Sequence, residues 1–364
     1  VHRSRDADTP EGIVVMDLSN VASGVVPHHR VFEGPTNNTH NIHVDTENGY
    51  LYRVGGAPTT WGMRIYDIHT DPLNPSFVAE YGRLDAQGND YNTDAERRAA
   101  GAENVHYIHD MQLVNVKSGS YAGKQIAFCA VGFEGYDKEY QDQNNGLWII
   151  DVTDKNNIQP LSYTGYPRSG YGHQVAVSED LTRAYLTDEY SSYPWPHTPM
   201  PSVWRTFDIT DLTASTYLGS FTNNENTINH NCFIEDSLMY CANYESGRRV
   251  LDLSVDKNAP PEVAFFDTHP ADEAQCCGGG TWSLHKFPSG TIALNDINRG
   301  LILVKVTVGA AHDLSCTVCG HKVGERPLWS WPADCETLGS NSCIDLKATY
   351  QTNGWCALAA ETAA

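Results

Sequence analysis

The sequence predicts an all-β protein, a β-propeller built from four-stranded blades. A short apolar phrase, usually led by Gly and closed by Asp, recurs along the chain, and each copy is too short and too β-branched for a helix. A hairpin-like segment precedes five of the copies. Four-stranded units repeated in this way are typical of a β-propeller, whose radial repetition leaves few open sheet edges. The copies are GIVVMD (12–17), GMRIYD (62–67), GLWIID (146–151), VWRTFD (203–208), GRRVLD (247–252) and GLILVK (300–305).

The hairpins supply the first two strands of each predicted blade, and the repeated phrase supplies the third. Asn48-Gly49 is a strong signal for a two-residue hairpin turn. A parallel β-helix is the main structural alternative, but its repeats are shorter and lack paired hairpins. The nearest helix candidate is the segment 93–105. The hairpins cover residues 41–56, 109–133, 173–189, 231–244 and 282–296.

Composition narrows the class of partner. The 364 residues carry a net charge of −21, which argues against binding a nucleic-acid backbone and suits a protein that attracts cations. No apolar run approaches the ~18–20 residues of a membrane span. Nucleic acid and a membrane span are therefore not expected.

Cysteine usage favours a secreted or cell-surface protein. The chain has 10 cysteines, and seven of them lie beyond residue 275. Asn37-Asn38-Thr39 is a glycosylation acceptor that fits this setting. Cys232 and Cys241 are expected to be cross-strand neighbours and to form a disulfide, and Cys129 to be a buried thiol or an unassigned disulfide partner. We expect two regions, a propeller over 1–306 and a Cys-rich, disulfide-stabilised tail over 307–364.

The order of several segments resembles the secreted choice-of-anchor B proteins, which are built from LVIVD-type repeats. This resemblance implies a propeller of seven blades, with six as an alternative. About one and a half blades would precede residue 12, and Val1-His2 would be the tail of a second strand. A removed N-terminal segment or a second chain would then complete the propeller. The segments that carry the resemblance are THNIHVDTENGYLY, YIHDMQL, GYGHQVAVSEDLTRAYLTDE, INHNCFIEDSLMYCANYESGRRVLDLS and EVAFFDTHPADEA…GGGTWS.

Four histidines share one position, at the start of a blade's first strand, where side chains line the central channel of a propeller. We therefore expect a metal site that holds Zn, Cu, Mn or Fe, with nearby carboxylate and amide groups orienting the rings. The histidines are His40, His109, His173 and His230, and the supporting groups are Asp110, Glu189 and Asn243.

Other interpretations of these residues stay open. The histidines could instead bond backbone groups of the neighbouring blade and keep the blades in register. A Ca²⁺ site among Asp110, Glu134 and Asp188 is a weaker alternative. If the protein is an enzyme, Glu134, Asp188 or Tyr190 would move a proton beside the metal.

Two further sets of residues recur. An Asp ends most copies of the repeated phrase and is expected to cap the following turn; these are Asp17, Asp67, Asp151, Asp208 and Asp252. Tyr190, Tyr193, Trp195 and Trp204 could form a wall that stacks on sugars, or a loop packed on its own rings.

Two functions follow. The first is an extracellular, metal-dependent lyase or hydrolase, or a binding protein, that takes a small molecule or a glycan. The second is a non-catalytic scaffold that joins other extracellular protein subunits and holds at most a structural ion.

Overall fold

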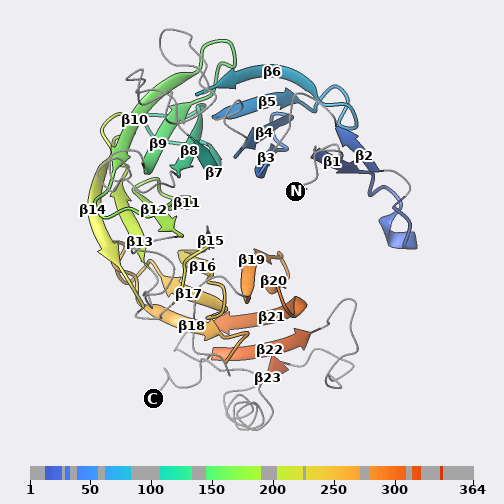
Figure 1. Ribbon diagram of the computed structural model, residues 1–364, viewed down its shortest axis with the longest axis vertical. Helices are drawn as coiled ribbons and strands as arrows, with labels where there is room; N and C mark the ends of the chain where they lie inside the picture. The colour runs from blue at the N-terminus through green and yellow to red at the C-terminus, as the bar shows by residue number, and fades with distance from the viewer. Residues whose placement is uncertain are drawn as a thin grey trace. The chain divides into compact units, whose positions relative to one another are not determined.

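In a computed structural model, the regular secondary structure of the described residues is almost entirely β-strand (Figure 1). The structure describes residues 13–26, 29–32, 39–55, 62–82, 107–132, 145–189, 203–223, 227–270, 279–308, 314–320 and 337–338. Within these ranges the helical content is one 3₁₀ turn, Val21–Ser23. The helix candidate 93–105 lies outside them.

Small antiparallel sheets contain all of the described strands, and each sheet keeps its strands in chain order. The first two strands, β1 (Ile13–Met16) and β2 (His29–Phe32), form a two-stranded sheet. The four-stranded sheets are β3 (Asn41–Asp45), β4 (Tyr50–Val54), β5 (Met63–Asp67) and β6 (Ser76–Tyr81); β7 (Ile108–Asn115), β8 (Gln125–Val131), β9 (Gly146–Asp151) and β10 (Gln159–Gly165); β11 (Gly172–Val177), β12 (Arg183–Asp188), β13 (Trp204–Asp208) and β14 (Thr216–Phe221); and β15 (Asn231–Glu235), β16 (Leu238–Ala242), β17 (Arg248–Asp252) and β18 (Glu262–Phe266).

The last sheet has five strands. They are β19 (Thr281–Lys286), β20 (Thr291–Asp296), β21 (Gly300–Val308), β22 (Leu314–Gly320) and β23 (Thr337–Leu338). Its two outer strands therefore come from the Cys-rich region beyond residue 307. The cysteine side chains of that region lie outside the described residues.

This is the β-propeller arrangement of small antiparallel blades, and the described residues contain five of them. The expectation of seven blades, or of six, was wrong. The count of seven rested on the resemblance, which adds strands ahead of residue 12, whereas among the described strands β1 pairs with β2 in a two-stranded sheet.

The repeated phrase forms the third strand of each blade, as predicted. Its Asp caps the next turn, because the carboxylate accepts the backbone N–H two or three residues further on. Backbone N–H groups of Thr70 and Thr210 thereby lower the pKa of Asp67 and Asp208. The bonds run from Ser19 to Asp17, Thr70 to Asp67, Thr153 to Asp151, Thr210 to Asp208 and Ser254 to Asp252.

The chain forms two compact units. The first contains the described residues up to Pro167, with Tyr171–Val175 and Asp211–Ser215, and the second contains the remaining described residues. Each unit has its own apolar core, in which residues of adjacent blades pack together. In the first, Tyr52 and Ile65 of one blade pack with Cys129 and Trp148 of the next. In the second, Tyr240 packs with Leu284 and Leu294.

The hairpin of β15 and β16 has the predicted register. Asn231 pairs with Ala242 and Cys232 pairs with Cys241. The two cysteines form a disulfide, as expected. Cys129 is a buried free thiol, which was one of the two expected states.

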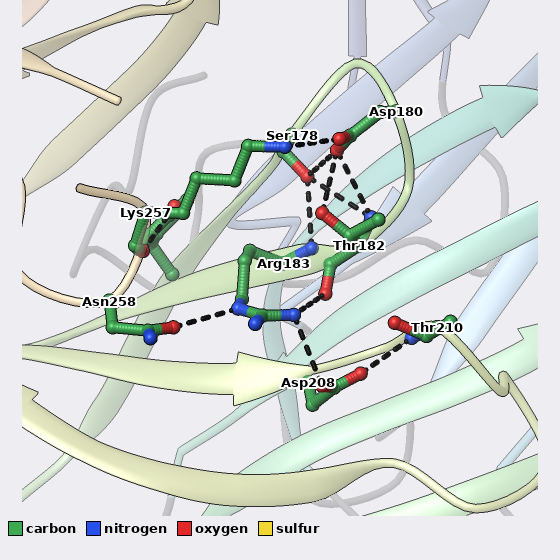
Figure 2. Close-up of polar contacts among 9 residues, drawn as sticks. Ser178, Asp180, Thr182, Arg183, Asp208, Thr210, Lys257 and Asn258 are labelled. Carbon is green, nitrogen blue, oxygen red and sulfur yellow. Dashed lines mark hydrogen bonds and ion pairs between the residues drawn. The ribbon is translucent and has the colours of Figure 1, made fainter. Parts of the chain in front are cut away.

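Ion pairs join the hairpin turns of some blades to the next blade. In the turn between β11 and β12, Asp180 accepts hydrogen bonds from the hydroxyls of Ser178 and Thr182, each 2.8 Å long. It also pairs with Lys257 (Figure 2), a residue of the next blade. In the same way Lys286 of β19 contacts Glu235, the last residue before the hairpin turn of the preceding blade, at 2.8 Å.

Candidate metal centre

His230 stands immediately before β15 and is held in place by two backbone groups. Its own N–H donates to the carbonyl of Ala242 at 3.1 Å. Its Nδ1 lies 2.5 Å from the carbonyl oxygen of Trp282, which can only accept, so Nδ1 carries the proton. In the neutral form of this ring, Nε2 carries the lone pair. A buried, neutral imidazole with this tautomer is suited to bind a metal ion.

Glu189 follows directly after β12 and supplies a carboxylate beside that lone pair. Its Oε1 lies 3.9 Å from Nε2 of His230. The same Oε1 accepts a hydrogen bond of 2.6 Å from the phenol of Tyr244. The sequence suggested Glu189 only as a supporting group. Its position makes it a ligand candidate.

His173, in β11, completes a group of three. One ligand atom each from His173, Glu189 and His230 lie within 4.8 Å of one another. Two imidazoles and one carboxylate are a common ligand set for Zn²⁺, Fe²⁺ and related ions, and such sites keep coordination positions open for water or substrate. The donor set therefore fits the metal that the sequence predicted.

The other two predicted histidine ligands lie outside the group, although the ring of His109 contacts those of both His40 and His173. The ring centroids of His40 and His109 are 4.4 Å apart, and those of His109 and His173 are 4.1 Å apart. Nδ1 of His109 lies 2.7 Å from the carbonyl oxygen of His173. All four histidines stand at the start of a blade's first strand, but the three-residue group contains only two of them.

The histidines also join neighbouring blades, as the alternative interpretation held. His109 and His230 each bond a backbone carbonyl of the next blade through the ring. In two blades the Asn that follows the histidine also donates to a backbone carbonyl of the next blade. The side chain of Asn41 bonds the carbonyl of His109, and that of Asn231 bonds the carbonyl of Trp282, each at 3.1 Å. In His109 and His230 the ring bond to the neighbouring blade uses Nδ1.

Three of the remaining predicted residues are also in the structure. Asp188 is fully buried; it accepts the N–H of Gly170 at 2.8 Å and lies 3.8 Å from Nη2 of Arg205. Asp110 accepts the N–H of Met111 at 2.7 Å, and burial raises the pKa of its carboxyl to about 7. The backbone of Asn243 bonds Thr227, Ser246 and Gly247.

Several predictions fall on residues outside the described ranges, namely Glu134, Tyr190, Tyr193 and Trp195. Trp204 does not belong to a stacking wall, because its indole is fully buried. It stacks on Phe221 with centroids 5.2 Å apart, and its Nε1 donates to the sulfur atoms of the Cys232–Cys241 disulfide.

Two aromatic residues of the site were not predicted. The ring of Tyr244 meets that of His230 edge-on, 4.9 Å between centroids, and Trp282 lies 5.4 Å from the same ring. The indole of Trp282 is 44% exposed. A signal was available for Trp282, which stands in the fifth blade where the other blades place a histidine. For Tyr244 the only signal in the sequence was its position at the end of the predicted hairpin 231–244, on the same side as His230.

No family model matches the chain. Among solved structures, one of a candidate 6-phosphogluconolactonase from Bacteroides uniformis is 12% identical, with a TM-score of 0.44 over 85% of this chain and 90% of that one. A protein of unknown function from Desulfotomaculum acetoxidans is 9% identical, with a TM-score of 0.42 over 82% of this chain and 89% of that one. Nothing about activity follows from either. Within the described residues, no helix is long and apolar enough to cross a membrane.

Proposed function

We propose that this protein is an extracellular, metal-dependent β-propeller that binds or transforms a small molecule or a glycan at His173, Glu189 and His230. The observation that carries the proposal is the convergence of their ligand atoms within 4.8 Å. The hydrogen bond from Nδ1 of His230 to Trp282 supports it, since a second bond of this kind orients metal-binding histidines.

The reaction class we propose is metal-assisted hydrolysis or elimination. A bound divalent ion would polarise a carbonyl or acidic oxygen of the substrate. His173, Glu189 and His230 would hold it. Glu134 and Tyr190 stay predictions for proton transfer. Asp188 is the weaker candidate, because it already bonds Gly170 at 2.8 Å.

The exposed indole of Trp282 supports a ligand with a ring. It lies beside the ring of His230 and presents 44% of its surface to solvent. Large aromatic faces of this kind stack on apolar faces of ring-shaped ligands. Secretion and membership of the choice-of-anchor B proteins remain part of the proposal, and the disulfide supports an oxidising compartment.

Metal content and affinity test the site directly. We expect the native protein to bind one Zn²⁺ or Mn²⁺, measured by elemental analysis and by titration calorimetry. His173→Ala, Glu189→Gln and His230→Asn should each weaken binding by more than the roughly 10–100-fold typical of a supporting residue. Asn at 230 is preferred to Ala because its amide can still donate to the Trp282 carbonyl.

The matched control is His285→Ala in β19, which removes an imidazole whose ring packs on Phe287 at 4.7 Å. Its metal affinity should equal that of the native protein. Native protein that takes up no metal would overturn the proposal.

The alternative is a scaffold with at most a structural ion, favoured by the bonds that His109 and His230 make to neighbouring blades. A Co²⁺-loaded sample separates the two. Added azide or phosphate should change the visible spectrum of an open site. An unchanged spectrum would indicate a saturated, structural ion.

A further inference from the structure

Tyr244 lies beside the proposed metal site with a backbone that such a residue seldom adopts. Its φ is +46°, in the left-handed region that disfavours residues with a side chain. Residues held in this region carry backbone strain and occur at functional sites where the surrounding structure fixes them. The question is what fixes Tyr244 and what its side chain does there.

The surrounding backbone fixes it from two sides. Within the turn after β16, the N–H of Gly247 donates to the Tyr244 carbonyl at 2.9 Å. In the next blade, Thr281 exchanges two backbone bonds with Tyr244, of 3.1 Å and 2.8 Å. Gly280 has to be a glycine, because a Cβ there would come within 2.1 Å of the Tyr244 backbone.

The constraint directs the phenol at Glu189. The residue is 4% exposed, and its hydroxyl donates to Oε1 at 2.6 Å. Oε1 is also the carboxylate oxygen that lies 3.9 Å from Nε2 of His230. The phenol therefore bonds the same oxygen that an ion between Glu189 and His230 would meet.

We propose that Tyr244 is a positioning residue, which holds the Glu189 carboxylate in the orientation needed to bind a divalent ion. The proposal rests on the proposed function, since it concerns the same site. A carboxylate that is free to rotate must lose that freedom when the ion binds. A carboxylate that already accepts a hydrogen bond, as Glu189 does from Tyr244, has lost this rotational freedom before the ion binds, so binding costs less entropy.

The test is Tyr244→Phe, which removes only the hydroxyl and keeps the ring against His230. We expect a roughly 10–100-fold loss of Zn²⁺ and Mn²⁺ affinity, the range typical of groups that orient ligands. The unfolding midpoint of the metal-free protein should change no more than in the control. With Cu²⁺, the electron paramagnetic resonance spectrum of the variant should differ from that of the native protein.

The matched control is Tyr185→Phe. Tyr185 is also buried and also donates one hydrogen bond, of 2.7 Å, to the carbonyl of Lys257. It should retain native metal affinity and the native Cu²⁺ spectrum. Equal affinity in the native protein and Tyr244→Phe would overturn the positioning role while leaving the metal site in place. Absence of binding in the native protein would overturn the site itself.

Discussion

Asp110 illustrates how one partly buried carboxyl can set a pH dependence. Burial raises the pKa of this group to about 7, against 3.8 for an unperturbed aspartate. Between these values the unfolded chain loses a proton that the folded protein keeps. The free energy of unfolding should therefore fall as the pH rises from about 4 to about 7.

Asp110→Asn should remove this dependence. At pH 4 the variant and the native protein should unfold at similar urea concentrations. Above pH 7 the variant should be more stable, by at most about 4 kcal/mol at 1.36 kcal/mol per pKa unit. Asp67→Asn is the opposite case. The pKa of Asp67 is lowered in the folded protein, so its ionised carboxylate stabilises the fold at neutral pH and the variant should be less stable there. A stability difference for Asp110→Asn that did not vary with pH would contradict the assignment.

The residues of the candidate site could be predicted only where the repeat pointed to them. His173 and His230 were found because they recur at one position of the blade. The choice of these two over His40 and His109 depends on side-chain directions, which the spacing does not contain. Tyr244 was missed because its role depends on a left-handed backbone that no residue type in the turn announces.

At the scale of the element, the hairpin of β15 and β16 is stabilised by its disulfide. The bond closes a short loop, with a sequence separation of 9. Restricting the unfolded chain over such a loop is worth about 2.5 kcal/mol on the chain-entropy estimate. The sulfur atoms also accept the indole N–H of Trp204 from the neighbouring blade.

The variant Cys232→Ala/Cys241→Ala should therefore be less stable than the native protein by about 2–3 kcal/mol in urea unfolding. Dithiothreitol supplies the control, because it should lower the stability of the native protein more than that of the variant. An equal effect on both would show that the reductant acts elsewhere. The register of this hairpin was predictable, since it follows from counting back from the turn.

At the scale of the molecule, the sequence predicted the kind of architecture better than its extent. The blade was recognisable because hairpin, third strand and capping Asp repeat together. The number of blades was wrong because it came from a resemblance and not from strands in this chain. Contacts between blades, such as those of Figure 2, were not predictable because they join residues about 75 positions apart, as in the bond of Arg183 to Asn258.

These contacts between blades should depend on salt. Lys257→Met removes the partner of Asp180, and both side chains are partly exposed, 43% and 47%. We expect a loss of about 0.5–1 kcal/mol in urea unfolding at low ionic strength, shrinking in 1 M NaCl. Lys305→Met, at a lysine for which the described residues show no ion pair, is the control. A loss unchanged by salt would indicate packing of the lysine chain instead.

The double use of His230 has a consequence for how mutations in this protein would be interpreted. One nitrogen of the ring ties two sheets together, and the other faces Glu189. A mutational scan that measured only the amount of folded protein would group His230 with the residues of the apolar core. Such a scan would not detect the proposed role of His230 in metal binding. The same holds in evolution: if metal binding were lost, selection for the bond between the His230 ring and the Trp282 carbonyl would still retain the imidazole. Histidines at this position can therefore persist in relatives that bind nothing.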